Sequence, residues 1–307
     1  GDRRALARLI TVVEEGRPGT ERVLGLAYPR SGRSLRVGIT GAPGAGKSTL
    51  TDGLIAALRR REEQVAVLAV DPTSPFTGGA VLGDRVRMQD HASDPGVFIR
   101  SMASRGHLGG LSAAAPKALT LLDAAGFPYV LIETVGVGQD EVEVVNAADT
   151  TVVVVTPGWG DGIQAAKAGI LEIGDVFVVN KADRPGVDEA VADLRTMLAM
   201  GGERSWEPPI LTTVATRGSG LNEVVEAILS HRRHQEETGS LAAGRRTRRL
   251  GELRAALAAA YARRAVSVTA AAEHRRLTSL VEEGQLDPWT AAERLLGAVA
   301  SPPSALP

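Results

Sequence analysis

The chain has 307 residues, a formal net charge of −1, no cysteine, 44% hydrophobic residues and only 3% aromatic residues. This length suits one large α/β domain with appendages or two domains, and the composition predicts a core filled by aliphatic side chains. The absence of cysteine excludes disulfides, thiol catalysis and thiolate metal sites. The charge near zero, with no run of about 20 apolar residues and no signal-peptide pattern, leads us to expect a cytoplasmic protein that binds neither nucleic acid nor membrane.

The first predicted element is an amphipathic helix over residues 2–15. Its apolar residues include Leu6, Leu9 and Val13, which recur at helical spacing. The turn-like sequence RSGR follows and leads into the main part of the chain. We therefore assign residues 1–34 to an N-terminal helical extension.

Residues 35–230 alternate short apolar runs with helical patterns such as 48–61 and 188–200. The runs are rich in β-branched residues and apolar at consecutive positions, which is typical of parallel strands buried on both faces. They are LRVGIT (35–40), VAVLAV (65–70), YVLIET (129–134), TVVVVT (151–156), DVFVVN (175–180) and PILTTVA (209–215). Strands and helices in alternation predict an α/β fold, a doubly wound and mostly parallel sheet.

The composition changes after residue 230. Residues 231–307 are rich in arginine and alanine and predict a helical arm, in which Asp287 and Pro288 mark a helix start. The run RRTRR (245–249) could bind RNA or an anionic membrane. Because no aromatic residues interleave it, we interpret it as solvated surface or as part of ion pairs between subunits.

The sequence GAPGAGKS at residues 41–48 matches the pattern G-x-x-x-x-G-K-[ST] in full. It lies between a predicted strand and a predicted helix, where backbone N–H groups and the helix N-terminus converge on phosphate oxygens. Lys47 is expected to reach the β- and γ-phosphates, and Ser48 to bind Mg²⁺. The residues expected to bind nucleotide here are Gly41, Ala42, Pro43, Gly44, Ala45, Gly46, Lys47, Ser48 and Thr49.

The sequence NKAD at residues 180–183 also follows a predicted strand and matches N-K-x-D, the guanine-reading motif. Asp183 can accept from both N1–H and N2–H₂ of guanine, whereas adenine offers neither donor in that geometry. Asn180 is expected to brace the loop, and the stem of Lys181 to lie along the base. The end of the last predicted strand completes the nucleotide-binding set with Thr213, Val214 and Ala215.

The sequence ETVGVGQDE at residues 133–141 follows a further strand. Glu133 occupies the position where an acid holds Mg²⁺ directly or through water, and Gly136 would offer its N–H to the γ-phosphate. Val137 follows Gly136, so the water-positioning glutamine of the D-x-x-G-Q motif is missing, and we give Gln139 no role. We expect intrinsic hydrolysis to be slow and to need a partner.

A Pro- and Gly-rich loop, DPTSPFTGGAVLGDRVRM, covers residues 71–88 and carries the carboxylates of Asp71 and Asp84. Such a loop could become ordered around Mg²⁺ and phosphate, as switch segments do. The residues alone leave open a solvated loop in which Asp71 caps a turn.

Together, these stretches resemble one family, the MeaB/ArgK/MMAA-type GTPases that guard B12-dependent acyl-CoA mutases. The matching stretches are GAPGAGKSTL, DPTSPFTGGAVLGDRVRM, SRGHLGGLS, ETVGVGQDEVEV, PGWGDGIQAAKAGILEIGDVFVVNKAD and, more weakly, LDPWTAAERLL. They cover residues 36–183 densely. The resemblance implies a P-loop GTPase domain at 35–230, an N-terminal helical extension and a C-terminal helical arm that forms a homodimer.

The resemblance also implies roles for individual residues. The loop at 157–167 matches a third switch that senses the mutase, with Asp161 and Lys167 in its functional positions, although from the residues alone Lys167 is an ordinary exposed helix lysine. The implied catalytic residues are Lys47, Asp84, Glu133, Gly136 and Lys167. The implied metal and switch residues are Ser48, Asp71, Asp84 and Glu133.

The implied function is that of a GTP-hydrolysing chaperone that gates cofactor loading and protects or reactivates an adenosylcobalamin-dependent acyl-CoA mutase. Methylmalonyl-CoA mutase is the first expectation for the partner, with GTP or GDP and Mg²⁺ bound. A metallochaperone GTPase is one alternative, but His231 and His234 lack a third ligand, which favours solvated surface. A P-loop small-molecule kinase is another, which phosphate transfer to an amino acid would identify.

Overall fold

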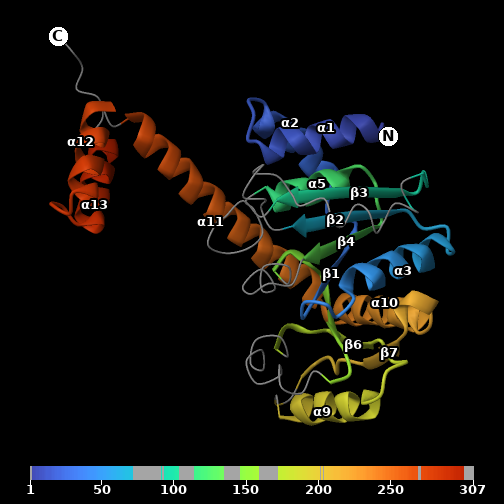
Figure 1. Ribbon diagram of the computed structural model, residues 1–307. Helices are drawn as coiled ribbons and strands as arrows, with labels where there is room; N and C mark the ends of the chain where they lie inside the picture. The colour runs from blue at the N-terminus through green and yellow to red at the C-terminus, as the bar shows by residue number, and fades with distance from the viewer. Residues whose placement is uncertain are drawn as a thin grey trace. The chain divides into compact units, whose positions relative to one another are not determined.

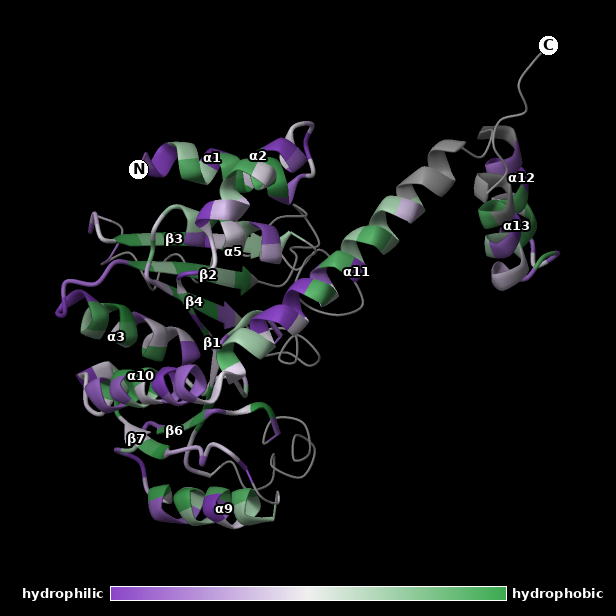
Figure 2. Ribbon diagram, turned by 180° about the vertical axis from the view of Figure 1, so that it is seen from behind, coloured by the Kyte–Doolittle hydropathy of each residue, from purple (hydrophilic) through white to green (hydrophobic). Residues whose placement is uncertain are grey.

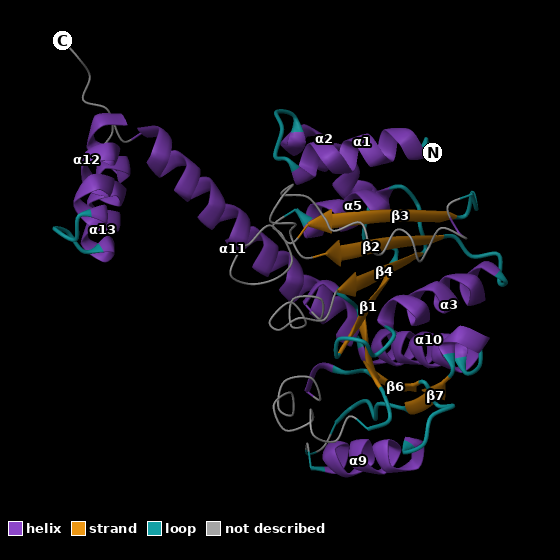
Figure 3. Ribbon diagram, viewed as in Figure 1, coloured by secondary structure: helices purple, strands orange, loops and turns teal. Residues whose placement is uncertain are grey.

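The computed structural model describes residues 2–71, 91, 93–103, 114–134, 146–158, 172–200, 202, 204–268 and 271–300. The chain divides into two compact units, Gly1–Arg245 and Arg246–Pro307, and each is described by itself. The first unit is a sheet covered by helices on both faces (Figures 1 and 3). No helix of the described residues is long and apolar enough to cross a membrane.

The sheet has seven strands within the described residues, and every neighbouring pair is parallel. Their order is β3-β2-β4-β1-β5-β6-β7. The bounds are β1 Leu35–Gly41, β2 Val65–Asp71, β3 Val97–Ala103, β4 Tyr129–Thr134, β5 Thr150–Val155, β6 Val176–Asn180 and β7 Ile210–Thr213. The predicted doubly wound parallel sheet is confirmed. The chain leaves β1 toward one edge and later returns on its other side, so β1 marks the position where such sheets bind ligands at their carboxyl ends.

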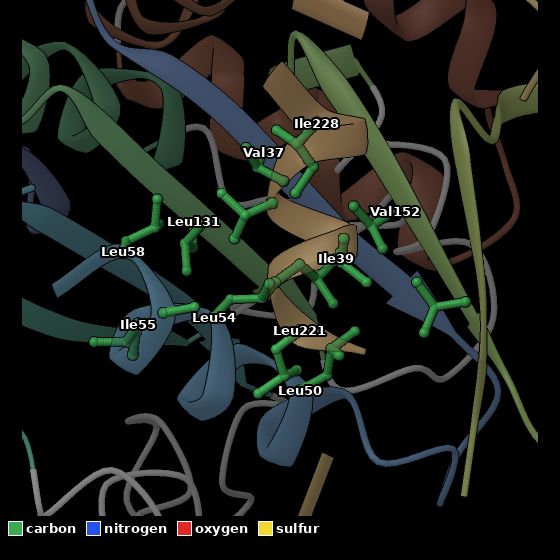
Figure 4. Packing of buried hydrophobic residues seen from close by; sticks show 14 of the residues in the cluster. Val37, Ile39, Leu50, Leu54, Ile55, Leu58, Leu131, Val152, Leu221 and Ile228 are labelled. Atoms are coloured by element: carbon green, nitrogen blue, oxygen red, sulfur yellow. The ribbon is translucent and has the colours of Figure 1, made fainter. Parts of the chain in front are cut away.

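Helices α3 (Lys47–Arg59) and α10 (Leu221–Thr238) lie side by side on one face of the sheet (Figure 1). Gly53 permits this approach, because a Cβ atom there would lie 2.6 Å from a methyl group of Leu221. Figure 4 shows Leu54 and Ile228 from the two helices packed against Val37 of β1. Figure 2 shows that these helices mix hydrophilic and hydrophobic residues, the amphipathic pattern of a helix with one buried face.

The opposite face is covered by α1 (Arg3–Glu14), α5 (Ala115–Ala124) and α9 (Val187–Ala199). The predicted N-terminal helix is confirmed as α1, which Asp2 caps by accepting hydrogen bonds from the backbone N–H groups of Arg4 and Ala5. The short helices α2 (Thr20–Ala27) and η1 (Tyr28–Arg30) follow it and had no clear sequence signal.

Helix α11 (Ser240–Val268) begins in the first unit and continues into the second, which also contains α12 (Ala271–Glu282) and α13 (Pro288–Ala300). The predicted helix start is confirmed, since Asp287 Oδ1 accepts from the backbone N–H of Thr290 at 2.8 Å. Leu277 and Ala291 are buried within this unit. The expected boundary between residues 230 and 231 falls inside α10. The dimerising role expected of the C-terminal arm at 231–307 stays a prediction.

Candidate nucleotide-binding site

The phosphate loop connects β1 to α3 and is built around glycines that the fold itself requires. Gly41 has φ +136°, and a Cβ atom there would lie 2.0 Å from the carbonyl oxygen of Val154 in β5. Gly46 has φ +92° and would bring a Cβ atom to 2.4 Å from Asn180 Nδ2. Neither position leaves room for a side chain, so the backbone itself lines this turn, as a phosphate-binding loop requires.

Lys47 and Ser48 open α3 at the end of this turn, and both side chains are buried. Lys47 Nζ donates to the carbonyl oxygens of Gly41 at 2.7 Å and Ala42 at 3.1 Å. The ammonium group thus lies over the loop that the sequence assigns to phosphate. A charge held there beside the N-terminus of a helix attracts an anion.

Ser48 and Glu133 bring two oxygen atoms together from different elements. Ser48 Oγ donates to Glu133 Oε1 at 2.5 Å, and Glu133, on β4, is buried. A hydroxyl and a carboxylate are ligands of the kind that Mg²⁺ prefers, so this pair fits the metal that the sequence predicts. The backbone of Asp71 ends the neighbouring strand β2, which pairs with β4.

Asn180 links the guanine-reading loop to the phosphate loop. Its Nδ2 donates to the carbonyl oxygen of Ala45 at 3.0 Å, while its Oδ1 accepts from Thr213 Oγ1 at 3.0 Å and from the backbone N–H of Ala215 at 3.2 Å. The predicted bracing role of Asn180 agrees with these contacts. The contacts also give Thr213 and Ala215 a supporting part through Asn180, and Val214 holds their turn through backbone hydrogen bonds with Ser219.

Lys181 and Asp183 lie on the same loop after β6. Lys181 has the left-handed φ of +59° and donates from Nζ to the carbonyl oxygen of Gly44 at 2.6 Å. Asp183 is exposed, and its Oδ2 lies 3.6 Å from the guanidinium of Arg217, a residue that no sequence motif identified. The carboxylate expected to read guanine thus sits at the open side of the loop, next to a cation.

Four of the predicted residues, Asp84, Gly136, Asp161 and Lys167, lie outside the described part of the chain. The remaining nucleotide-binding residues all gather at the carboxyl ends of β1, β4, β6 and β7. Hydrogen bonds join the phosphate loop both to the acid predicted to hold metal and to the guanine-reading loop. Sequence reasoning placed these motifs but not the bonds between them.

His231 corrects one expectation, because it is buried and is not part of a solvated surface. Its Nδ1 lies 2.9 Å from Thr150 Oγ1, its Nε2 lies 3.4 Å from Asp175 Oδ1, and the ring of Trp206 packs against it. Burial raises the pKa of Asp175 to about 7 and lowers the pKa of His231 to about 4. Among the described residues, no group of three or more His, Asp or Glu side chains is placed to hold a metal ion.

Arg245 corrects another expectation, because this first arginine of the RRTRR run is not solvated but forms an ion pair with the buried Asp149 of the same chain. The contact joins the start of α11 to the start of β5. Both residues belong to the first unit, so the pair is part of that unit's own packing.

A glycine loop between a strand and a helix, bonded to an N-K-x-D loop at the carboxyl edge of a parallel sheet, defines the class of the P-loop GTPases. The comparison with protein families agrees. The chain belongs to the MeaB family, since the family model of the methylmalonyl Co-A mutase-associated GTPase MeaB matches residues 6–270.

Related proteins extend this likeness over nearly the whole chain. A protein of Pyrococcus horikoshii named a GTPase is 50% identical over 300 residues, which cover 96% of this chain and 94% of that protein. The GTPase ArgK of Escherichia coli is 39% identical over 250 residues, 78% of this chain and 76% of that protein. The crystal structure of an LAO/AO transport system kinase matches with a TM-score of 0.70 and 29% identity, covering 98% of this chain and 94% of that one, and confirms the fold.

Proposed function

We propose that this protein hydrolyses GTP to GDP and phosphate with Mg²⁺, slowly when alone. The observation that carries this proposal is the hydrogen bond from Asn180 to Ala45, since it joins the predicted guanine-reading loop to the phosphate loop. Asp183 would select guanine, because a carboxylate that the bound base covers and leaves without the two guanine donors disfavours other bases. GTPase names among the relatives support the same activity.

The residues of the site divide the work. Lys47, with the N-terminus of α3, would neutralise charge on the β- and γ-phosphates, and Gly136 would donate its N–H to the γ-phosphate. Ser48 and Glu133, with Asp71 and Asp84, would hold Mg²⁺, which when bound draws charge from the phosphate oxygens. Val137 in place of a glutamine leaves the attacking water without the usual positioning side chain, so unaided turnover should be slow.

We further propose that GTP hydrolysis gates cofactor loading into an adenosylcobalamin-dependent acyl-CoA mutase and protects or reactivates that enzyme, with methylmalonyl-CoA mutase as the first candidate. The family description names this mutase. A Caenorhabditis briggsae protein named methylmalonic aciduria type A homolog is 42% identical over 199 residues, 60% of this chain and 48% of that protein. Asp161 and Lys167, in the loop at 157–167, would sense the docked mutase.

The C-terminal arm supports the proposal of a homodimer. Exposed apolar side chains recur along α11 at helical spacing, and these are Leu250, Leu253, Leu257 and Tyr261. An exposed apolar stripe of this kind is stabilised when a second helix covers it. We propose that the second helix belongs to another copy of the chain.

Single-turnover hydrolysis with and without a saturating B12-dependent mutase tests the function. The unmodified protein should bind GTP and GDP far more tightly than ATP, and the mutase should accelerate hydrolysis. Ser48→Ala should reduce hydrolysis much more than GDP binding. Lys167→Ala should keep its GTP affinity and lose most of the stimulation. Equal affinity for ATP and GTP would contradict the GTPase proposal, and no stimulation by any such mutase would contradict the chaperone proposal.

The same assay decides the second candidate, a small-molecule kinase. This candidate is favoured by the description of the related crystal structure as an LAO/AO transport system kinase. Radiolabelled γ-phosphate should appear as inorganic phosphate if the protein is a GTPase. Label transferred to an amino acid in place of water would favour the kinase.

A further inference from the structure

A short segment ahead of β3, here called the α3 strap, consists of His91 and residues 93–96 and runs along α3. Two side-chain contacts hold it to α3. His91 Nε2 lies 3.3 Å from Asp52 Oδ1, and Arg59 Nε donates to Asp94 Oδ2 at 2.9 Å. Asp52 and Arg59 are two helical turns apart, so they lie on the same side of α3. The strap is therefore attached to α3 at two points. The near end, the contact of His91 with Asp52, is closer to the phosphate loop, and the far end is the contact of Asp94 with Arg59.

The far end is fixed by several contacts that do not involve His91. Asp94 Oδ1 also accepts from the backbone N–H of Gly96 at 2.7 Å, and Arg3 donates to the carbonyl oxygen of Asp94 at 2.9 Å. Arg59 donates to the carbonyl oxygen of Glu63 at 2.7 Å. Packing is close as well, because a Cβ atom on Gly96 would lie 2.2 Å from the guanidinium carbon of Arg59. These contacts give the far end a structural role.

The near end of the strap lies one helical turn from a residue of the proposed metal site. Asp52 follows Ser48 by four residues on α3, so the two side chains project from the same side of the helix one turn apart. Ser48 is the residue that contacts Glu133 in the proposed metal site. The His91 side chain is only 14% exposed, which means that its imidazole is held in place by packing as well as by Asp52.

We propose that His91 is a positioning residue for GTP hydrolysis, acting through Asp52 on the Ser48 side of the site. The inference rests on the proposed GTPase function. In the sequence, His91 directly follows the region that carries Asp84, seven residues upstream. His91 thus fixes the chain to α3 one turn from Ser48. Small displacements of groups around a reacting phosphate reduce rates strongly even when the displaced group does not touch the substrate.

The test compares the two ends of the strap. His91→Ala should slow single-turnover GTP hydrolysis about tenfold or more and raise the Mg²⁺ concentration needed for half-maximal rate, as loss of a supporting partner does at metal sites. GDP affinity should stay within about twofold, because the phosphate loop and Asn180 are untouched. His91→Gln should recover part of the rate, since its amide N–H can still reach Asp52. Asp94→Ala is the matched control: it should lower the melting temperature at least as much, yet leave the rate within about twofold.

A His91→Ala protein that hydrolyses GTP at the unmodified rate would overturn the proposal. So would an Asp94→Ala protein that loses as much rate as His91→Ala, because the strap would then act only through stability. Binding of Mg²⁺ with a slowly hydrolysed GTP analogue gives a second measurement, in which His91→Ala should lose affinity for the analogue and not for GDP. Failure of the GTPase function is recognised separately, since the unmodified protein would then show no turnover at all.

Discussion

The guanidinium of Arg245 and the carboxylate of Asp149 form a two-bonded ion pair, with Nε 3.0 Å from Oδ1 and Nη2 2.6 Å from Oδ2. Arg245 also donates to the carbonyl oxygens of Gly32 and Ser34, each at 2.7 Å. Asp149 is buried, and its Oδ2 accepts a further hydrogen bond from the backbone N–H of Arg36. The start of α11 is thus bonded to the entry of β1 and to the start of β5.

Arg245→Ala should destabilise the protein by about 3 kcal/mol, because it leaves the buried carboxylate of Asp149 without its cation. Nucleotide affinity should change little, since the pair lies at the amino-terminal ends of the strands, away from the phosphate loop. Urea unfolding and GDP titration measure the two effects. Arg246→Ala is the control, because Arg246 is exposed, and it should leave stability within about 0.5 kcal/mol. Equal unfolding midpoints for the two variants would contradict the prediction.

Shortened chains test the proposed dimer. A chain that ends after residue 249 keeps Arg245 and the contacts of α10, and it should be a folded monomer that binds GDP. A chain that ends after residue 230 loses His231, Gln235 and Arg245, and it should unfold at lower urea concentration. Sedimentation at micromolar concentration gives the oligomeric state. A monomeric full-length chain would contradict the homodimer.

Asp183→Asn should weaken GTP binding by about 2 kcal/mol or more, because an amide oxygen cannot accept both guanine donors without leaving its own N–H₂ unpaired. The same change should favour xanthine nucleotides, which present an acceptor at that edge. Competition binding with GDP and xanthosine diphosphate measures the exchange of preference. Unchanged preference for GDP would remove Asp183 from base recognition.

Thr213→Val should lower GDP affinity about tenfold, because Asn180 Oδ1 loses a buried donor and its bond to Ala45 becomes less well oriented. Binding of pyrophosphate alone should change less, since the phosphate loop keeps its glycines and Lys47. Thr212→Val is the matched control, as this neighbouring threonine is exposed. If both variants bound GDP equally, Thr213 would have no supporting role.

The pair formed by the half-buried Asp175 and the buried His231 predicts an unusual pH dependence of stability. Burial raises the pKa of Asp175 to about 7, and it lowers the pKa of His231 to about 4, with a further lowering from His234 and an opposing effect of Asp149. Between pH 4 and 6.5 the folded pair therefore keeps one proton on Asp175, while the unfolded chain keeps one on His231. Because folded and unfolded chains bind equal numbers of protons there, the pair should contribute little pH dependence.

Single substitutions of Asp175 and His231 should make the free energy of unfolding change with pH in opposite directions. In Asp175→Asn the unfolded chain binds the extra proton through His231, so the free energy of unfolding should rise as pH increases from 4 to 6.5. In His231→Gln the folded chain binds the extra proton through Asp175, so the free energy of unfolding should fall as pH increases from 4 to 7. Each unit of pKa shift corresponds to about 1.4 kcal/mol. Urea unfolding at several pH values would contradict the pairing if both variants gave the same sign.

The sequence predicted the parts of this protein that depend on local pattern. The β-branched runs identified six of the seven described strands, because a strand buried on both faces is apolar at every position. They missed β3 (Val97–Ala103), an edge strand whose sequence VFIRSMA is interrupted by Arg100 and Ser101. The phosphate loop and NKAD were found because chemistry fixes their spacing. The sequence did not predict contacts between residues far apart in the chain, such as those between Asn180 and Ala45 and between Arg245 and Asp149. His231 was misread for the same reason, since only the folded chain brings Thr150 and Asp175 to its ring.

Gly41 and Gly44 of the phosphate loop differ in whether another residue could replace them. At Gly41 the carbonyl oxygen of Val154 already occupies the place of a side chain, whereas a Cβ atom on Gly44 would meet nothing within 4 Å. A descendant of this chain that no longer bound nucleotide would therefore still need glycine at position 41, because the carbonyl oxygen of Val154 in β5 leaves no room for a side chain. At 44, where φ is +74°, asparagine could take over. Loss of nucleotide binding would therefore show as a substitution at position 44 and not at position 41.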